Sequence, residues 1–396
     1  MPPTWIPRSA LIAALALALG ACSSGDDDDT AAATEETPAT SAPDTTLAPA
    51  PPTPGAEWEV VDPAAVGLDG AKLEELADVA EAGKSNCFLV VRDGKIAGEW
   101  YFRDTNEHSA QEVFSASKSF ASTLVGIAQD DGDLTISQPA STWIDEWKGT
   151  PADAVTVRNL LSNDSGREWS LALDYVQMLQ AEDRTAFAVG LGQPDPPGTV
   201  WVYNNSAIQT LQRVLQGATG EEVTEFAEDR LFEPLGMRDT DMTTDVAGNA
   251  LMFMGVQSTC RDMARFGVLA LNRGNWGGEQ IVSDAWWDGA TGTSSTIMNA
   301  AYGYLWWLNR EGFLAGATAP VNVEVVESPD APSGQLVADA PEDMFWAQGL
   351  GNQIIQVDPG SRTVVVRLGT GEPQPQPPTF GRNDAARVVT EAVLEE

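Results

Sequence analysis

The sequence is poor in the residues that most often carry catalysis and metal binding. It has one histidine, His108, and three cysteines in 396 residues. A Ser-His-Asp triad would have to use His108, and a site built from several histidines is excluded. His108 lies in a polar stretch, residues 104–111, which favours an exposed loop histidine. A Gly-x-Ser-x-Gly nucleophile elbow is also absent, so a serine hydrolase of this sequence needs lysine or tyrosine as its base.

Basic residues are scarce too. Lys and Arg number 22 against 58 Asp and Glu, which gives a formal net charge of −36. Such a surface repels phosphate backbones, and the sequence has no Lys/Arg-rich run, so we expect no nucleic-acid partner. The charge also disfavours anionic partners in general, although an excess of acidic residues more often reflects solubility in salt.

The N-terminal apolar run is too short to span a bilayer. Residues 10–21 are apolar and follow Arg8, which is typical of a secretory signal. The run ends at residues 19–22, Leu-Gly-Ala-Cys, which resemble a bacterial lipobox and imply cleavage before Cys22 and lipid attachment to it. We expect a signal peptide over residues 1–21 and a lipoprotein on the outer face of the cell membrane. The alternatives are a plain signal peptide of a secreted protein and an uncleaved anchor.

Residues 22–57 predict a solvated tether. Four consecutive aspartates, residues 26–29, are followed by a Thr/Ala/Pro-rich tract. So few apolar residues cannot offset the entropy that ordering would cost. The tether would hold a folded domain, residues 58–396, away from the membrane surface.

Two cysteines remain for the folded domain, Cys87 and Cys260. In an exported domain such a pair suggests one disulfide, but two free buried cysteines are an equally common outcome. No spacing resembles a zinc site, and we expect neither a metal nor an organic cofactor.

A serine followed three residues later by a lysine is the central catalytic signal. Ser115 and Lys118 stand at the start of an apolar helical pattern that ends near Asp130. Residues three apart share a helix face, so the two side chains can meet. The first helical turn has unpaired N–H groups and favours negative charge, which suits an attacking alkoxide. The pair predicts a nucleophile and its base, although chance alone would supply roughly 0.3 such pairs in this composition.

Strand patterns occur toward both ends of the chain, with helical patterns between them. The runs that read as strands are residues 87–91, 96–102, 302–308, 353–357 and 363–368. A final helix is expected over residues 382–394. This order predicts an α+β fold, with an antiparallel sheet from both chain ends, flanking helices and an inserted, mostly helical half. Residues 311–342 are Ala/Pro/Gly-rich and long enough to form a lid over a site.

Several motifs then agree in order and spacing. They are Ser-Ala-Ser-Lys at residues 115–118, Leu-Leu-Ser-Asn-Asp-Ser-Gly at 160–166, Pro-Gly at 197–198, Tyr-Asn-Asn at 203–205 and Pro-Leu-Gly-Met at 234–237. Together they resemble the serine β-lactamase and penicillin-binding protein superfamily, above all its class C-like branch of esterases, carboxypeptidases and 6-aminohexanoate-dimer hydrolases. The likeness covers residues 58–394.

The resemblance implies acyl transfer through an acyl-enzyme. Ser115 would attack a carbonyl, and Lys118 would take its proton once burial or a neighbouring cation has lowered the pKa of the lysine. Tyr203 would shuttle the proton to the leaving group. Asn205 would orient Lys118 and the substrate by hydrogen bonds.

The implied oxyanion hole combines the Ser115 backbone N–H with one from a late strand that carries Lys-Thr-Gly or His-x-Gly in the family. The best match here is residues 346–353, with Gly349 as the glycine and Leu350 supplying the N–H. Ala347 then stands where a cation or histidine is usual, and alanine cannot pair with a substrate carboxylate.

A neutral ester or amide is therefore the expected small-molecule substrate. Two other readings remain open: a β-lactamase or D-alanyl-D-alanine carboxypeptidase on the same scaffold, and a non-catalytic binding protein of this fold.

Overall fold

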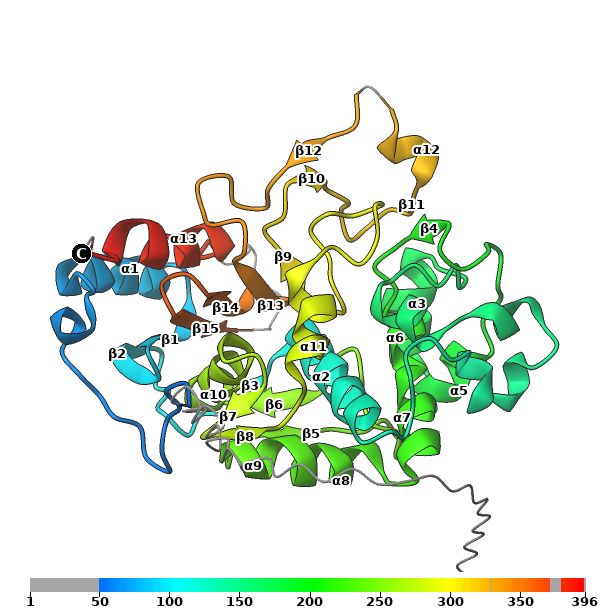
Figure 1. Cartoon of the computed structure of the whole chain (residues 1–396), viewed down its shortest axis with the longest axis horizontal. Helices are drawn as coiled ribbons and strands as arrows, with labels where there is room; N and C mark the ends of the chain where they lie inside the picture. Colours follow the sequence, from blue (N-terminus) through cyan, green and yellow to red (C-terminus); the bar gives the residue numbers. More distant parts are fainter. Residues whose placement is uncertain (1–49, 329, 371–378, 395–396) are drawn as a thin grey trace, which may run out of the picture. The chain divides into compact units, whose positions relative to one another are not determined.

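The computed structural model describes residues 50–328, 330–370 and 379–394 (Figure 1). These residues belong to one folded unit, Pro49–Glu396. The predicted signal peptide, the predicted lipid site at Cys22 and most of the predicted tether lie outside the described residues. In the part of the chain that is described, no helix is long and apolar enough to cross a membrane.

Both ends of the folded unit contribute to one six-stranded sheet. Its strands are β1 (Ser85–Arg92), β2 (Lys95–Tyr101), β9 (Trp307–Leu308), β13 (Phe345–Gly349), β14 (Gln353–Asp358) and β15 (Thr363–Gly369). Their order is β2-β1-β15-β14-β13-β9, and each pairing is antiparallel. The β1–β2 turn is Asp93-Gly94, at φ 49° and 74°, which suits a tight hairpin. The α+β class and the mixed origin of the sheet are confirmed.

Helices cover one face of the sheet near the chain ends. Helix α1 (Gly70–Ala82) and helix α13 (Arg382–Arg387) lie side by side there (Figure 1). A π-helical turn, Val388–Ala392, continues α13. Alternate residues of β1, such as Phe88 and Val90, belong to the hydrophobic cluster beneath these helices.

The opposite face of the sheet packs on helix α10 (Cys260–Leu271) and helix α2 (Ser117–Asp130). Helix α10 comes so close that a Cβ on its Gly267 would lie 2.5 Å from a methyl carbon of Val364. Every residue of α2 from Ser117 to Ala128 is buried, whereas the sequence pattern indicated only an apolar stripe. The helix that follows the nucleophile is therefore held from all sides.

Mostly short helices make up the inserted half (Figure 1). They are α3 (Val157–Leu161), α4 (Met178–Gln180), α5 (Arg184–Val189), α6 (Asn205–Gln209), α7 (Leu211–Thr219), α8 (Val223–Ala227) and α9 (Glu233–Leu235). Short strands accompany them: β3 (Gln111–Glu112), β4 (Val200–Trp201), β5 (Asp241–Met242), β6 (Val256–Ser258), β7 (Asn275–Trp276) and β8 (Glu279–Gln280). Helix α11 (Asp284–Trp287) follows.

The insertion at residues 311–342 carries its own short elements. They are β10 (Gly312–Phe313), β11 (Val321–Asn322), α12 (Val323–Val326) and β12 (Ser333–Gly334). Strand β10 pairs with β12, and β11 pairs with β4 of the helical half. The β11–β4 pairing thus attaches the insertion to the helical half.

One strand boundary was predicted wrongly. The strand expected over residues 302–308 is reduced to β9, because the chain turns at Leu305, where φ is 60°. The last residues of the predicted tether contact the folded domain, since Asn272 donates a side-chain hydrogen bond to the Pro52 carbonyl (2.9 Å). Arg265 likewise donates to the Gly55 carbonyl (3.0 Å). The Pro-rich composition concealed these contacts, which depend on carbonyl oxygens rather than on side chains.

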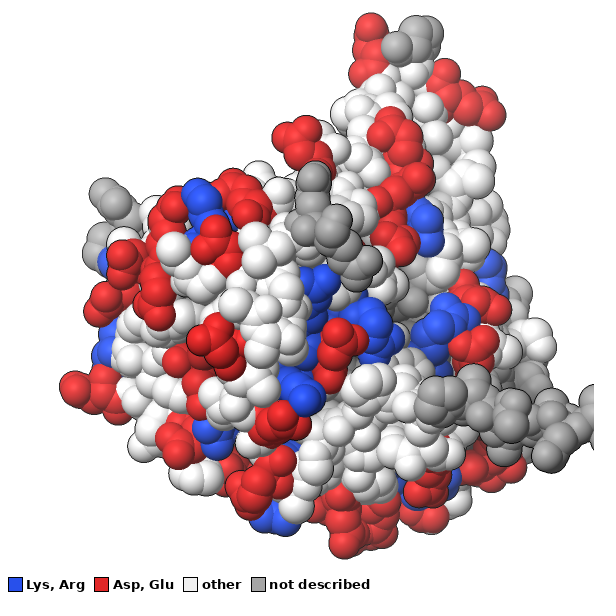
Figure 2. Space-filling view, turned by 60° about the vertical axis from the view of Figure 1, so that its left-hand side comes forward, with Lys and Arg blue, Asp and Glu red and all other residues white. Residues whose placement is uncertain are grey.

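The structure joins Cys87 of β1 to Cys260 of α10 in a disulfide, a pairing that the sequence left open. The bond links the sheet to the first turn of the helix beneath it. On the face of the molecule shown in Figure 2, acidic side chains are spread widely and outnumber basic ones, as the composition requires.

Candidate active site

Ser115 lies in a 3-10 turn, Phe114–Ala116, that leads directly into α2. The sequence placed this serine in the first turn of the helix itself, whereas the α-helix begins two residues later, at Ser117. The Lys118 ammonium nitrogen donates a hydrogen bond to Ser115 Oγ at 2.8 Å. The i, i+3 spacing therefore brings the two side chains together, as expected.

Lys118 is almost completely buried, with 1% of its surface exposed. Besides Ser115, its ammonium donates to the backbone carbonyl of Phe253 at 2.7 Å. Burial lowers the pKa of Lys118 to about 7, and the negative charge of Asp174 opposes this only in part. A lysine in this state is available as a neutral base near physiological pH.

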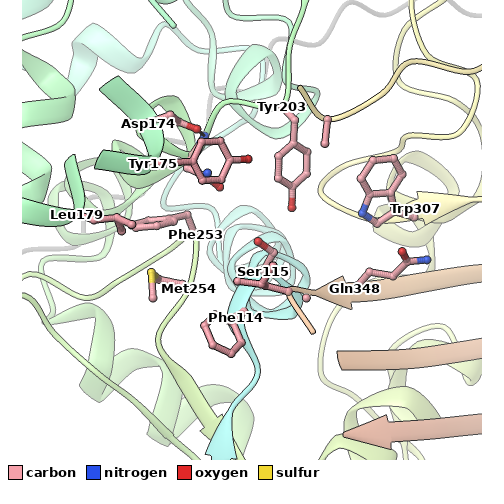
Figure 3. Close-up of a pocket in the computed structure, with 14 residues that line it drawn as sticks. Phe114, Ser115, Asp174, Tyr175, Leu179, Tyr203, Phe253, Met254, Trp307 and Gln348 are labelled. Carbon is pink, nitrogen blue, oxygen red and sulfur yellow. Dashed lines mark hydrogen bonds between the residues drawn. The ribbon is translucent and has the colours of Figure 1, made fainter. Parts of the chain in front are cut away.

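Tyr203 follows β4 and points its hydroxyl toward Ser115 (Figure 3). Its ring is 4.8 Å from the Lys118 ammonium and stacks on Trp307 at 5.7 Å between ring centres. Burial raises the pKa of the Tyr203 hydroxyl, and contact with the Ser115 side chain offsets this only partly. The hydroxyl therefore stays protonated at neutral pH, which suits a relay rather than a primary base.

Asn205 is the first residue of α6, and a buried carboxylate holds it in place. Asp174 accepts hydrogen bonds from the backbone N–H groups of Asn205 (2.9 Å) and Ser206 (2.7 Å). The Asn205 side chain lies near the Tyr175 hydroxyl, and its Oδ1 is buried with no hydrogen-bond partner among the described residues.

The expected hydrogen bond between Asn205 and Lys118 is not among those of the described residues. The Phe253 carbonyl takes the second bond of the ammonium instead, because the loop before β6 passes directly beside it. The unpartnered Asn205 Oδ1 remains available to a substrate N–H.

Strand β13 ends against the nucleophile turn. A Cβ on Gly349 would lie 2.1 Å from the Val113 carbonyl oxygen, so this close approach requires glycine. In the turns and loops that the structure describes, neither the Ser115 nor the Leu350 N–H donates to a backbone carbonyl. Both residues line the same cavity, which fits the predicted pair of oxyanion donors.

The cavity that Ser115 opens into has a volume of about 380 Å³. Tyr203, Asn205, Gly349 and Leu350 also line it, together with Phe114, Asp174, Tyr175, Leu179, Phe253, Met254, Trp307, Ala317 and Gln348. Ala317 comes from the insertion at 311–342, so this segment forms part of the wall, in keeping with the lid that its length suggested.

Ala347, which the sequence placed at the usual cation position, is fully buried in the hydrophobic core. It is not among the described residues that line the cavity, whereas the next residue, Gln348, is. The strand thus presents a neutral amide to the cavity and no positive charge.

His108 is an exposed loop residue, as predicted. Its ring pairs with the Asp239 carboxylate at 2.8 Å, with 73% of the histidine side chain exposed. That contact raises the pKa of His108. The only histidine of the chain is not among the cavity-lining residues, so it does not serve Ser115.

Sequence reasoning missed several residues that shape the site: Asp174, Tyr175, Leu179, Phe253, Met254 and Trp307. None belongs to a short motif, and each reaches the cavity through tertiary packing. Only the apolar run of residues 251–254, between polar segments, hinted at a buried turn.

Comparison with known proteins agrees with this geometry. A 6-aminohexanoate-dimer hydrolase of Paenarthrobacter ureafaciens is 25% identical over 276 residues, 62% of this chain and 70% of that protein. The structure of a candidate beta-lactamase from Bacteroides dorei matches 82% of this chain and 99% of its own, with a TM-score of 0.65 and 19% identity.

A class C beta-lactamase in complex with cefoxitin matches 83% of this chain and 98% of its own, with a TM-score of 0.56 and 16% identity. These two structural matches show a shared fold. The sequence model of the Beta-lactamase family matches residues 77–389, nearly all of the folded unit. The chain therefore belongs to the beta-lactamase family and is a serine hydrolase of that family.

Proposed function

We propose that this protein is an extracytoplasmic hydrolase that cleaves a neutral ester or amide through an acyl-enzyme on Ser115. One observation carries the proposal. The Ser115 hydroxyl accepts a hydrogen bond from Lys118 at 2.8 Å, and burial brings the pKa of that lysine to about 7. A nucleophile beside a base with a matched pKa is the arrangement that acyl transfer needs.

The reaction follows from these contacts. Neutral Lys118 takes the Ser115 proton while Oγ bonds to the substrate carbonyl carbon, and the carbonyl oxygen gains negative charge between the Ser115 and Leu350 N–H groups. The bond to the leaving group then breaks, and Tyr203 passes on the proton that the leaving group needs. Water attacks the ester on Ser115 by the same route, which releases the acid and restores the serine.

The charges of the cavity support a neutral substrate. Asp174 is the only carboxylate among the described lining residues, and backbone N–H groups of α6 already occupy its oxygens. Gln348, a neutral residue, lines the cavity, whereas Ala347, which stands at the usual cation position, is buried in the core. None of the described lining residues is basic, and Arg382, in the adjoining cavity, donates to the Gln348 amide oxygen (3.4 Å). A substrate carboxylate in the Ser115 cavity would therefore lose hydration without meeting a cation in its wall.

Export is supported by the predicted signal peptide at residues 1–21 and by the Cys87–Cys260 disulfide, since such bonds persist in oxidising compartments. Attachment of a lipid to Cys22 is part of the proposal. It would place the hydrolase at the outer face of the membrane. Mass spectrometry of protein from the membrane fraction would detect the lipid on an N-terminal Cys22, and an unmodified N-terminus would refute it.

Three reagents test the activity. A fluorophosphonate probe should label the wild-type protein and not Ser115→Ala, and p-nitrophenyl acetate should be hydrolysed by the wild type alone. Nitrocefin should be a poor substrate, because none of the described residues that line the cavity is basic. Labelling that persists in Ser115→Ala would refute the nucleophile assignment.

Rapid nitrocefin turnover would instead favour β-lactamase activity. A class C beta-lactamase shares this fold. A protein that neither reacts with the probe nor hydrolyses any ester would be a binding protein of this fold.

A further inference from the structure

The residue before the nucleophile has an unfavourable backbone conformation. Phe114 has a φ of 48°, in the left-handed region that glycine adopts freely and that a residue with a bulky side chain rarely does. Such outliers persist where the surrounding structure enforces them, commonly at functional sites. A glycine would satisfy the backbone here, so the side chain of Phe114 calls for an explanation.

The Phe114 side chain forms part of the cavity wall. In Figure 3 it lies below Ser115, with Leu179, Phe253 and Met254 beside it on one side of the serine. Leu179 comes from α4, and Phe253 and Met254 come from the loop before β6. We call these four residues the apolar chamber. Its side chains contain no charged or hydrogen-bonding group apart from the weakly accepting Met254 sulfur.

The other side of Ser115 has a different character. Trp307 and Gln348 lie there, and Trp307 stacks on the Tyr203 ring. Because Tyr203 delivers the proton to the leaving group, that group must depart along the wall formed by Tyr203 and Trp307. The acyl substituent of the same carbonyl then extends toward the opposite side, where the apolar chamber lies below Tyr175 and Asp174 in Figure 3.

We propose that the apolar chamber binds the acyl group of the substrate and selects an unbranched hydrocarbon chain of several carbons over acetyl. This inference rests on the proposed function and deepens it by naming the acyl class. The Phe253 backbone carbonyl also holds Lys118, so the chamber and the base share one loop.

The first test varies the acyl chain while the alcohol stays the same. We expect kcat/KM for p-nitrophenyl esters to rise from acetate through butyrate to hexanoate, by up to about fourfold for each methylene that is fully buried. A second series keeps the acetyl group and lengthens an alkyl alcohol, and kcat/KM should change little along it. Dependence on the alcohol and not on the acyl chain would overturn the assignment.

Two variants test the chamber directly. Phe114→Gly removes one wall without opposing the backbone conformation, and Met254→Trp fills the space. Both should reduce the hexanoate-to-acetate ratio of kcat/KM at least about threefold, and this ratio does not depend on how much of a preparation is folded. Val246→Ala, at an apolar residue that is 83% exposed and outside the cavity, should leave the ratio unchanged.

The outcomes separate the two proposals. Fluorophosphonate labelling of Ser115 with an unchanged ratio in both variants would overturn the chamber alone. Failure of the wild type to label would overturn the proposed function and the chamber with it.

Discussion

Lys118 is the residue whose state decides the chemistry. It is one of 22 basic residues in the chain, and it is buried without a carboxylate in contact. Its two described partners, Ser115 Oγ and the Phe253 carbonyl, can accept a hydrogen bond from either the ammonium or the neutral amine. Desolvation is thus the main cause of its lowered pKa, and Asp174 opposes it.

The pH dependence of catalysis follows from that pKa. Because only neutral Lys118 can accept the serine proton, kcat/KM should rise with pH to a plateau above about 7, falling about tenfold for each pH unit below it. Lys118→Arg, which stays protonated, should lower kcat/KM by about 10²–10⁴-fold across the range. A flat profile between pH 5 and 8 in the wild type would contradict Lys118 as the base.

Folding stability provides an independent check on the same residue. The folded pKa is about 7 and the unfolded value 10.5, so between these pH values the unfolded chain binds the extra proton. The free energy of unfolding should therefore increase with pH across this window, by up to about 1.4 kcal/mol per pH unit from Lys118. Below pH 7 both states bind the proton, so Lys118 should add no further pH dependence. Urea unfolding of the wild type and Lys118→Met at pH 6, 8 and 10 isolates that contribution.

The contribution of Tyr203 to kcat/KM should be largest for substrates whose leaving group must be protonated. Its hydroxyl stays protonated because burial raises its pKa, and it lies beside Ser115. Tyr203→Phe should lower kcat/KM for an alkyl ester or an amide by about 10²–10⁴-fold. The loss should be at least about tenfold smaller for p-nitrophenyl esters, whose leaving group departs as an anion. Equal losses for both substrates would assign Tyr203 a structural role instead.

At the scale of elements, the oxyanion site depends on how closely β13 meets the nucleophile turn. Alanine at position 349 would place its Cβ 2.1 Å from the Val113 carbonyl, so the strand must withdraw from the turn. Gly349→Ala should therefore lower kcat/KM about 10²–10³-fold, the usual effect of losing one oxyanion donor.

Gly360→Ala is the matched control, since its nearest atoms would be 3.9 Å away in the turn between β14 and β15 of the same sheet. It should behave as wild type. If Gly349→Ala also kept wild-type rates, Leu350 would not be an oxyanion donor.

The sequence could predict the parts of the site that are local. Ser115 and Lys118 meet because they are one helical turn apart, and the spacing alone indicated it. Gly349 was found through a family pattern, although only the structure shows that Val113 makes glycine necessary. The partner of Lys118 could not be foreseen, because Phe253 is 135 positions away and contributes a backbone carbonyl, which every residue type has.

Element boundaries failed where tertiary contacts override composition. Residues 302–308 have a strand-like apolar pattern, yet Trp306 is fully buried on the far side of a turn at Leu305. Burial of Tyr302, Leu305 and Trp306 in the core explains their apolar character, and only residues 307–308 pair as a strand.

At the scale of the whole molecule, the topology was predictable because strand patterns lie near both chain ends and helical patterns between them. What could not be predicted is how the inserted half and residues 311–342 close around one cavity. That arrangement depends on pairings such as β4 with β11, whose strands are two residues each and 120 positions apart at Trp201 and Val321. Such short strands leave almost no periodic signal in the sequence.

The Cys87–Cys260 disulfide should contribute to the stability of the whole unit. It closes a loop with a sequence separation of 173, and it joins the central sheet to α10. Removing it with Cys87→Ser and Cys260→Ser should cost about 2–5 kcal/mol, largely because the unfolded chain regains conformational freedom. Chemical unfolding of the double variant measures this loss, and the reduced wild type should match it. An intact mass unchanged by reduction would instead show two free thiols, and the sheet and α10 would then be held together by their hydrophobic contacts alone.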